Sequence, residues 1–166
     1  KVVGVDVALP CLRYAHARAN ALGVEADFSQ QNVEKTNYDS ESFDLVTSTL
    51  LLHETSHDAV PNIIQECFRL LKPGGWMIHL DVYPFHKKEE EPLYDFLKDW
   101  EVTNNNENFS GALRKMNMKK IIEDTGFATE TVEFTSAEAA AKYSKGYTGD
   151  FYLKLPVYVA QKSIAS

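Results

Sequence analysis

The sequence predicts an α/β fold with a doubly wound, mostly parallel sheet and helices on both faces. Two observations carry this prediction. Short β-branched or alternating segments take turns along the chain with amphipathic helical segments, and glycine or proline separates most of them. The closing pair of predicted strands suits an antiparallel edge. The 166 residues show no repeat or linker, so we expect a single domain over residues 1–166.

The first predicted elements occupy residues 2 to 50. The β-branched segment 2–7 predicts a buried strand. Pro10 suits the first turn of the next helix, which keeps helical spacing of apolar residues until Gly23. Alternation predicts a short strand over residues 24–30, and a longer strand over 43–50 follows a polar turn.

The later elements follow from the same signals. An amphipathic helix over residues 60–71 is stopped by Lys72-Pro73-Gly74-Gly75, because proline cannot continue a helix. Asn117 is a suitable cap for a helix that ends at Gly126. Further strands are predicted over residues 76–82, 127–134 and 151–161. Further helices are predicted over residues 89–100, 118–125 and 136–143.

Composition and charge narrow the class of partner. The net charge of −7 argues against nucleic acid or an anionic membrane, because both favour a basic surface. No apolar run approaches the roughly 20 residues that span a membrane. Cys11 and Cys67 lie in predicted helices and suit small core residues in a reduced compartment. We therefore expect a cytoplasmic protein without a nucleic-acid or membrane partner.

Two polar positions follow predicted strands. In doubly wound sheets, ligands bind beyond the carboxyl ends of the strands. Asp6 follows the first strand, and its carboxylate can accept both ribose hydroxyls of an adenosine group. After the next strand, Asn32 and the backbone N–H of Val33 can read the edge of an adenine ring. A turn residue and a polar loop are the structural alternatives.

Four short motifs, taken in order, suggest a family. They are Gly4-Val5-Asp6, then FDLV at 43–46, LLKPGG at 70–75 and IIEDTGF at 121–127. Together they resemble the class I S-adenosylmethionine-dependent methyltransferases, and most of all the small-molecule group that includes the ubiquinone/menaquinone methyltransferases. The resemblance spans residues 1–134. It implies a Rossmann-like methyltransferase sheet, S-adenosylmethionine as cofactor, and methyl transfer to a small-molecule acceptor.

The resemblance also implies roles for individual residues. Asp6 matches the ribose-binding acid, and Val7 matches its neighbour beside the adenine. Asn32 stands where the family usually has an aspartate that contacts the adenine amine, and its carbonyl can accept the same bond. Val33 supplies the backbone N–H. The segment that lines the methionine part of the cofactor corresponds to Thr49 and Leu50.

The segment His53-Glu54-Thr55-Ser56-His57 offers two interpretations. It satisfies H-E-x-x-H, a zinc-protease pattern that needs both histidines on one helical face. Here the segment follows a strand, so we predict a loop at the mouth of the cofactor site and no metal. His53 is a candidate general base for an oxygen or nitrogen nucleophile, or a loop histidine satisfied by hydrogen bonds.

A set of aromatic residues follows the strand predicted over residues 76–82. In the family, this region helps to cover the substrate, and an aromatic wall suits an apolar acceptor. A stripe of this kind also suits the core. The residues are Tyr83, Phe85, Tyr94, Phe96 and Trp100.

The sequence departs from the family at its beginning. The family's first strand and glycine-rich turn, which would precede Lys1, are absent, so the chain matches an N-terminally truncated form. That strand is central in the family's sheet, and its loss opens a gap of roughly 9–10 Å. Either the flanking strands close together, another chain fills the gap, or the fold changes. Exposed edges favour self-association.

Three functions stay open at this point. The first is a methyltransferase, with its activity lowered or lost by truncation. The second is a non-catalytic binding or scaffold module that keeps the methyltransferase fold. The third is a nucleotide-binding dehydrogenase, because an acid after the second strand of the sheet also serves NAD enzymes.

Overall fold

The computed structural model describes residues 1–81, 115–128, 133–139 and 153–164. It also describes isolated positions between these ranges, namely Phe96, Trp100, Thr103, Asn104, Phe109 and Leu113.

The smaller of two sheets is formed by the first part of the chain. Strand β1 (Val3–Asp6) pairs in parallel with β2 (Asp27–Gln30), and helix α1 (Leu9–Leu22) connects them. This is the right order for a parallel pair, because the chain must cross back before the second strand begins. Gly23 ends α1 in the left-handed conformation (φ 67°), as predicted.

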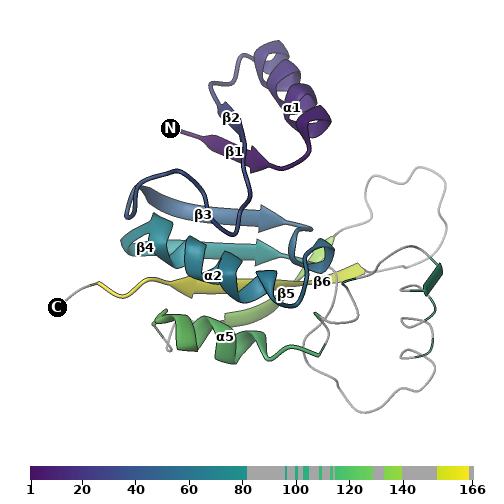
Figure 1. Cartoon of the computed structure of the whole chain (residues 1–166), viewed down its shortest axis with the longest axis vertical. Coiled ribbons are helices and arrows are strands. Elements are labelled where there is room, and N and C mark those ends of the chain that lie inside the picture. Colours follow the sequence, from purple (N-terminus) through teal and green to yellow (C-terminus); the bar gives the residue numbers. More distant parts are fainter. Residues whose placement is uncertain are drawn as a thin grey trace.

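The larger sheet has four strands in the order β3-β4-β6-β5 (Figure 1). β3 (Phe43–Thr49) and β4 (Leu71–Leu80) are parallel. β6 (Leu153–Gln161) runs antiparallel to both β4 and β5 (Glu133–Ala139). The α/β class and the antiparallel C-terminal strand are thereby confirmed.

Two helices pack against each other on one face of the larger sheet. In Figure 1, α2 (Ala59–Leu70) lies in front of β4, with α5 (Met118–Thr125) beside it. Asn117 caps α5 as predicted, because its Oδ1 accepts the Lys120 N–H at 3.1 Å. The buried core joins α2, α5 and the inner face of the sheet, with Val60, Ile63, Ile64, Met77, Met118, Ile122, Tyr158 and Ala160. Among the described residues, no helix has the length and apolar character needed to cross a membrane.

The KPGG segment ends α2 but belongs to β4. Phe43 pairs with Leu71 and Leu45 pairs with Trp76, so the extra residues of β4 bulge out between these pairs. Glycine is needed within the bulge. Gly74 has a positive φ of 81°, and a Cβ on Gly75 would lie 2.9 Å from the Lys72 carbonyl oxygen.

Two sequence predictions, a helix at residues 136–139 and a buried Cys11, are wrong. Residues 136–139 lie in β5 rather than in a helix, because they pair with β6 from Ser136↔Pro156 to Ala139↔Leu153. The strand predicted over 127–134 lies partly outside the described residues; of its described part, Phe127 forms a bridge to Lys162, and residues 133–134 lie in β5. Cys11 is exposed, unlike its neighbour Leu12, whereas Cys67 is buried as predicted.

The strands that flank the expected gap do not close together. Within the described residues, β1 pairs only with β2, and β3 pairs only with β4 (Figure 1). The strand predicted as buried over 2–7 is consequently half-exposed, with Val2 62% and Val7 64% accessible. Leu45 on β3 is also half-exposed. Both strands therefore present an edge without a strand partner among the described residues.

The helix predicted over 89–100 lies outside the described residues, apart from two positions. The same holds for Tyr83, Phe85 and Tyr94 of the aromatic set. Its other two members, Phe96 and Trp100, have exposed side chains.

Candidate active site

The predicted site residues lie at or beyond the carboxyl ends of β1, β2 and β3. β1, β3 and β4 point the same way in Figure 1, and β2 is parallel to β1. Asp6 therefore ends β1 at the edge where Asn32 follows β2 and Leu50 follows β3. Asp81 follows β4 at this same edge. The site is divided between the two sheets.

Asp6 holds the turn into α1. Its Oδ1 accepts the Ala8 N–H at 2.7 Å, which is the turn role that the sequence left open. Its Oδ2 accepts no hydrogen bond from the described residues. The neighbouring Val7 is exposed, and its carbonyl accepts the Gln30 Nε2–H at 2.8 Å, which ties the ends of β1 and β2 together. One carboxylate oxygen is thus left for a ligand.

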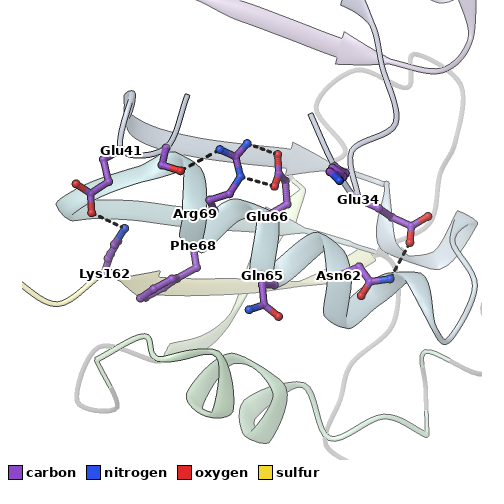
Figure 2. A pocket seen from close by; sticks show the side chains of 10 residues that line it. Glu34, Glu41, Asn62, Gln65, Glu66, Phe68, Arg69 and Lys162 are labelled. Carbon is purple, nitrogen blue, oxygen red and sulfur yellow. Dashed lines mark hydrogen bonds and ion pairs between the residues drawn. The ribbon is translucent and has the colours of Figure 1, made fainter. Parts of the chain in front are cut away.

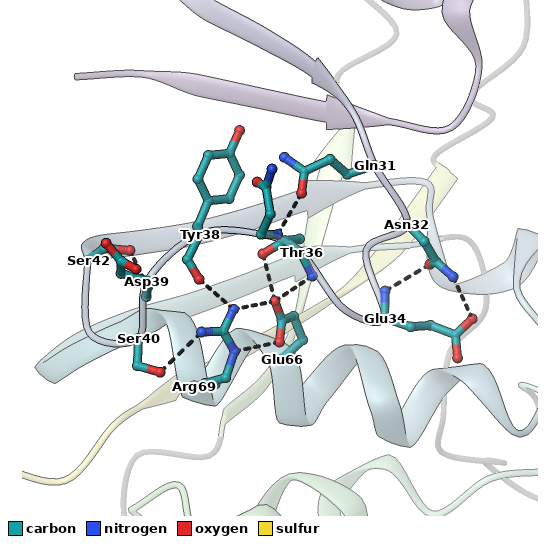
Figure 3. Close-up of polar contacts among 11 residues, drawn as sticks. Gln31, Asn32, Glu34, Thr36, Tyr38, Asp39, Ser40, Ser42, Glu66 and Arg69 are labelled. Carbon is teal, nitrogen blue, oxygen red and sulfur yellow. Dashed lines mark hydrogen bonds and ion pairs between the residues drawn. The ribbon is translucent and has the colours of Figure 1, made fainter.

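The loop after β2 begins with a tight turn at Asn32 (Figure 3). Asn32 Oδ1 accepts the Glu34 N–H at 2.9 Å, and its Nδ2 donates to Glu34 Oε1 at 3.3 Å. The Lys35 N–H donates to the Asn32 carbonyl oxygen at 3.2 Å. Asn32 is exposed, whereas Val33 packs against the core. These bonds fix the orientation of the Asn32 amide.

The chain leaves β3 through a strained residue. Leu50 has φ 57°, which costs a residue with a bulky side chain roughly 1–2 kcal/mol. Its N–H donates to the Leu80 carbonyl oxygen at 2.8 Å, so the left-handed turn is held against the end of β4. Thr49 and Leu50 are both exposed at this edge.

His53 and Asp81 form a buried pair beside this turn. His53 lies in a short 3₁₀ turn, η1 (Leu52–Glu54), and its Nδ1 is 2.6 Å from Asp81 Oδ1. Asp81 Oδ2 accepts the Leu52 N–H at 2.7 Å. Because a carboxylate can only accept a hydrogen bond, Nδ1 of His53 carries the proton, and its Nε2 is left as the acceptor. His53 Nε2 lies 3.5 Å from Oε1 of the exposed Glu54.

Asp81 is not among the site residues predicted from the sequence. Its position gave a usable signal, because an acid directly after a strand is the pattern that selected Asp6.

A second histidine lies deeper, between the sheet and α2. Ser48 Oγ is 2.5 Å from His79 Nδ1, and Cys67 Sγ is 3.8 Å from His79 Nε2. Burial lowers the pKa of His79 to about 4, although the nearby Asp81 carboxylate opposes this shift. Burial also raises the pKa of the Cys67 thiol to about 12. These groups are therefore neutral near pH 7, and the thiol is no nucleophile.

The two histidines of the H-E-x-x-H pattern make different contacts. His53 turns inward to Asp81, whereas His57 is 65% exposed and has its Nδ1 3.5 Å from Asp58 Oδ1. The segment is a 3₁₀ turn and loop rather than the interior of a helix. Across the described residues, no three His, Cys, Asp or Glu side chains are placed to hold a metal ion.

A hollow of about 780 Å³ lies elsewhere, along the outer side of α2 (Figure 2). Several of its polar and charged side chains bind one another. Lys162 Nζ lies 3.2 Å from Glu41 Oε1, and Asn62 Nδ2 donates to Glu34 Oε2 at 2.9 Å. Neither Asp6 nor the His53–Asp81 pair lines it, so the hollow is not the site at the strand ends.

Comparison with known proteins gives a family match for the first part of the chain. A family model described as "Methyltransferase domain" matches residues 1–75. A ubiquinone biosynthesis O-methyltransferase of Nitrosococcus oceani is 34% identical over 76 residues, which cover 45% of this chain and 31% of that protein. The first part of the chain is therefore similar to methyltransferase domains.

Other similarities extend over more of the chain. An uncharacterized protein of Haemophilus influenzae is 29% identical over 151 residues, 90% of this chain and 57% of that protein. The crystal structure of a SAM-dependent methyltransferase from Methanosarcina mazei has a TM-score of 0.68 at 19% identity, and the match covers 99% of this chain and 82% of that one. This match supports the Rossmann-like fold. The chain spans about a third of the length of the Nitrosococcus oceani protein and just over half of the length of the Haemophilus influenzae protein.

Proposed function

We propose that this chain binds S-adenosylmethionine at the carboxyl ends of β1–β4, and that the enzyme to which it belongs methylates a small-molecule acceptor. The observation that carries the proposal is the placement of Asp6, Asn32, Leu50 and the His53–Asp81 pair at this edge of a methyltransferase fold.

The residues at the edge fit the cofactor. Asp6 Oδ2 is available for the ribose hydroxyls, while Oδ1 holds the turn. Asn32 Oδ1 has a second lone pair for the adenine amine, and the Val33 N–H suits an adenine ring nitrogen. Thr49 and Leu50 would line the methionine part, with Val7 beside the adenine. When bound, the cofactor supplies a methyl group on a positively charged sulfur, so the protein mainly aligns the reactants.

His53 is the proposed general base. Asp81 holds the Nδ1 proton, which leaves Nε2 to take a proton from an acceptor hydroxyl or amine. Only acceptors that lose a proton at oxygen or nitrogen need this group.

The wider setting is also a proposal. We place the protein in the cytoplasm, since its two cysteines suit a reduced compartment, and the acidic net charge argues against nucleic-acid or membrane partners. The edges of β1 and β3 favour pairing with another copy of this chain. Light scattering at tens of micromolar tests the pairing, and a clean monomer would count against it.

A non-catalytic binding module is the second candidate. The division of the edge between two sheets favours it, because a divided site is less well organised for alignment. Binding without turnover is its expected signature. The dehydrogenase alternative does not agree with the family match.

Calorimetry with S-adenosylhomocysteine, the demethylated product, tests cofactor binding. In Asp6→Asn, the amide oxygen can keep the Ala8 bond while the second carboxylate oxygen is lost. We expect affinity to fall about 10- to 100-fold, as for a hydrogen bond to a charged group. Asp27→Asn is the control, because Asp27 begins β2 at the opposite edge and binds Lys1. The absence of heat with the unaltered chain at millimolar ligand would refute cofactor binding.

A further inference from the structure

The loop over residues 31–42 is bound to α2 through a buried carboxylate (Figure 3). Glu66 Oε1 accepts the Thr36 N–H at 2.8 Å and the Thr36 hydroxyl at 2.6 Å. Glu66 is buried, so these bonds replace water that the carboxylate has lost. The carboxylate thus joins the loop that carries Asn32 and Val33 to a helix of the core.

Arg69 completes the connection. Its Nε donates to Glu66 Oε2 at 2.8 Å and its Nη2 to Glu66 Oε1 at 2.7 Å, a two-bond pair. The same guanidinium donates to the Tyr38 carbonyl oxygen at 2.8 Å and to Ser40 Oγ at 3.1 Å. Hydrogen bonds from Arg69, and then from Thr36, lower the pKa of the Glu66 carboxyl to about 2, against the effect of burial. Glu66 is therefore ionised throughout the neutral range.

The adenine-facing end of the loop is tied down as well. Glu34, which holds the Asn32 amide, accepts the Asn62 Nδ2–H from α2 at 2.9 Å. Gln31 Oε1 accepts the Asn37 N–H at 2.7 Å across the base of the loop. The chain just after Asn32 is therefore anchored to α2 twice, at Glu34 through Asn62 and at Thr36 through Glu66.

We propose that Glu66 and Arg69 are positioning residues for the adenosine half of the cofactor, acting through the loop and touching no ligand themselves. This inference rests on the proposed function. If Asn32 Oδ1 accepts the adenine amine, its position decides how well the site distinguishes adenine from hypoxanthine, which has a carbonyl there. Release of the loop should weaken both the binding and this discrimination.

The test is calorimetry of Glu66→Gln with two probes, S-adenosylhomocysteine and its deaminated analogue S-inosylhomocysteine. An amide keeps one acceptor for Thr36 but turns an NH₂ donor toward Arg69 Nε. We expect binding of S-adenosylhomocysteine to weaken about tenfold, a typical coupling between separate sites. The preference over the deaminated analogue should fall by a similar factor, which simple destabilisation would not cause.

Two further variants keep the test decisive. Thr36→Val removes the hydroxyl bond to Glu66 and keeps the backbone N–H bond. It should lower both the affinity and the preference for adenine, by smaller factors than Glu66→Gln does, and it replaces that variant if Glu66→Gln does not fold. Asp124→Asn breaks an exposed pair with Lys120 (2.7 Å) on α5 and should change neither quantity.

The outcomes separate the two proposals. If the unaltered chain binds S-adenosylhomocysteine and the folded loop variants match it in affinity and preference, the positioning role is wrong and the proposed function stands. If the unaltered chain binds neither probe, the proposed function fails and this inference fails with it.

Discussion

The buried His79 predicts how the stability of the fold depends on pH. Its side chain is 1% exposed between Ser48 and Cys67, and it is held neutral. Burial lowers its pKa from 6.5 to about 4, so the unfolded chain takes up the proton at a higher pH than the folded chain does. This contribution to stability is complete above pH 6.5 and is lost as pH falls toward 4.

The size of the effect follows from that difference. One pKa unit corresponds to about 1.4 kcal/mol, so the whole loss is about 3 kcal/mol, with roughly 2 kcal/mol of it between pH 6.5 and 5. Glu66 acts in a lower window. Its pKa drops from 4.5 to about 2, so its contribution is present above pH 4.5 and is lost below it. Measurements between pH 7 and 5 therefore separate the effect of His79 on stability from that of Glu66.

Urea unfolding of the unaltered chain and His79→Gln, at intervals from pH 7 to 5, measures this effect. Glutamine can bond to Ser48 but does not titrate in this range. We expect the free energy of unfolding of the unaltered chain to fall by about 2 kcal/mol more than that of the variant. The variant can be less stable at every pH without affecting the test, because the prediction concerns how steeply the free energy of unfolding changes with pH. Parallel pH profiles would refute the reasoning.

Three other substitutions have defined outcomes. His53→Gln should lower turnover of a hydroxyl or amine acceptor by about 10²–10⁴-fold and leave S-adenosylhomocysteine affinity unchanged, as kinetics and calorimetry can check. Asp81→Asn should lower kcat more than it raises KM, because an amide that donates to Nδ1 imposes the other tautomer; equal effects would argue for a structural role. Gly75→Ala should cost about 1–3 kcal/mol in urea unfolding, because its Cβ would meet the Lys72 and Asp44 carbonyl oxygens at 2.9 and 3.2 Å. An unchanged midpoint would contradict that crowding.

Local signals in the sequence were enough to place most of the edge. Alternation and glycine or proline boundaries located β1, β2 and β3, and hence the residues that follow them. The pairing of His53 with Asp81 could not be predicted in this way, because 28 positions separate them and only the parallel pairing of β3 with β4 brings them together.

The errors arose where distant pairing outweighs local preference. Ser136 to Ala139 is an alanine-containing segment with good helix propensity, yet its backbone pairs with β6. A propensity of a few tenths of a kcal/mol per residue is easily overridden by a strand partner that satisfies every backbone group. The KPGG segment was placed correctly as a helix stop, but its inclusion in β4 depends on the register with β3.

Because the sheet is divided, the contacts of the loop over residues 31–42 with α2 matter for the geometry of the proposed site. Asp6 and Asn32 follow strands of the smaller sheet, whereas His53 and Asp81 belong to the larger one, and among the described residues no strand pairing joins the two sheets. Alignment of cofactor and acceptor requires both halves to keep a fixed relation, since small misplacements are costly in methyl transfer as in any displacement. The bonds from loop 31–42 to Glu66 and Arg69 span this division. Hydrogen exchange should therefore show the end of β2 and the loop losing protection together in Glu66→Gln, with the core of α2 unchanged.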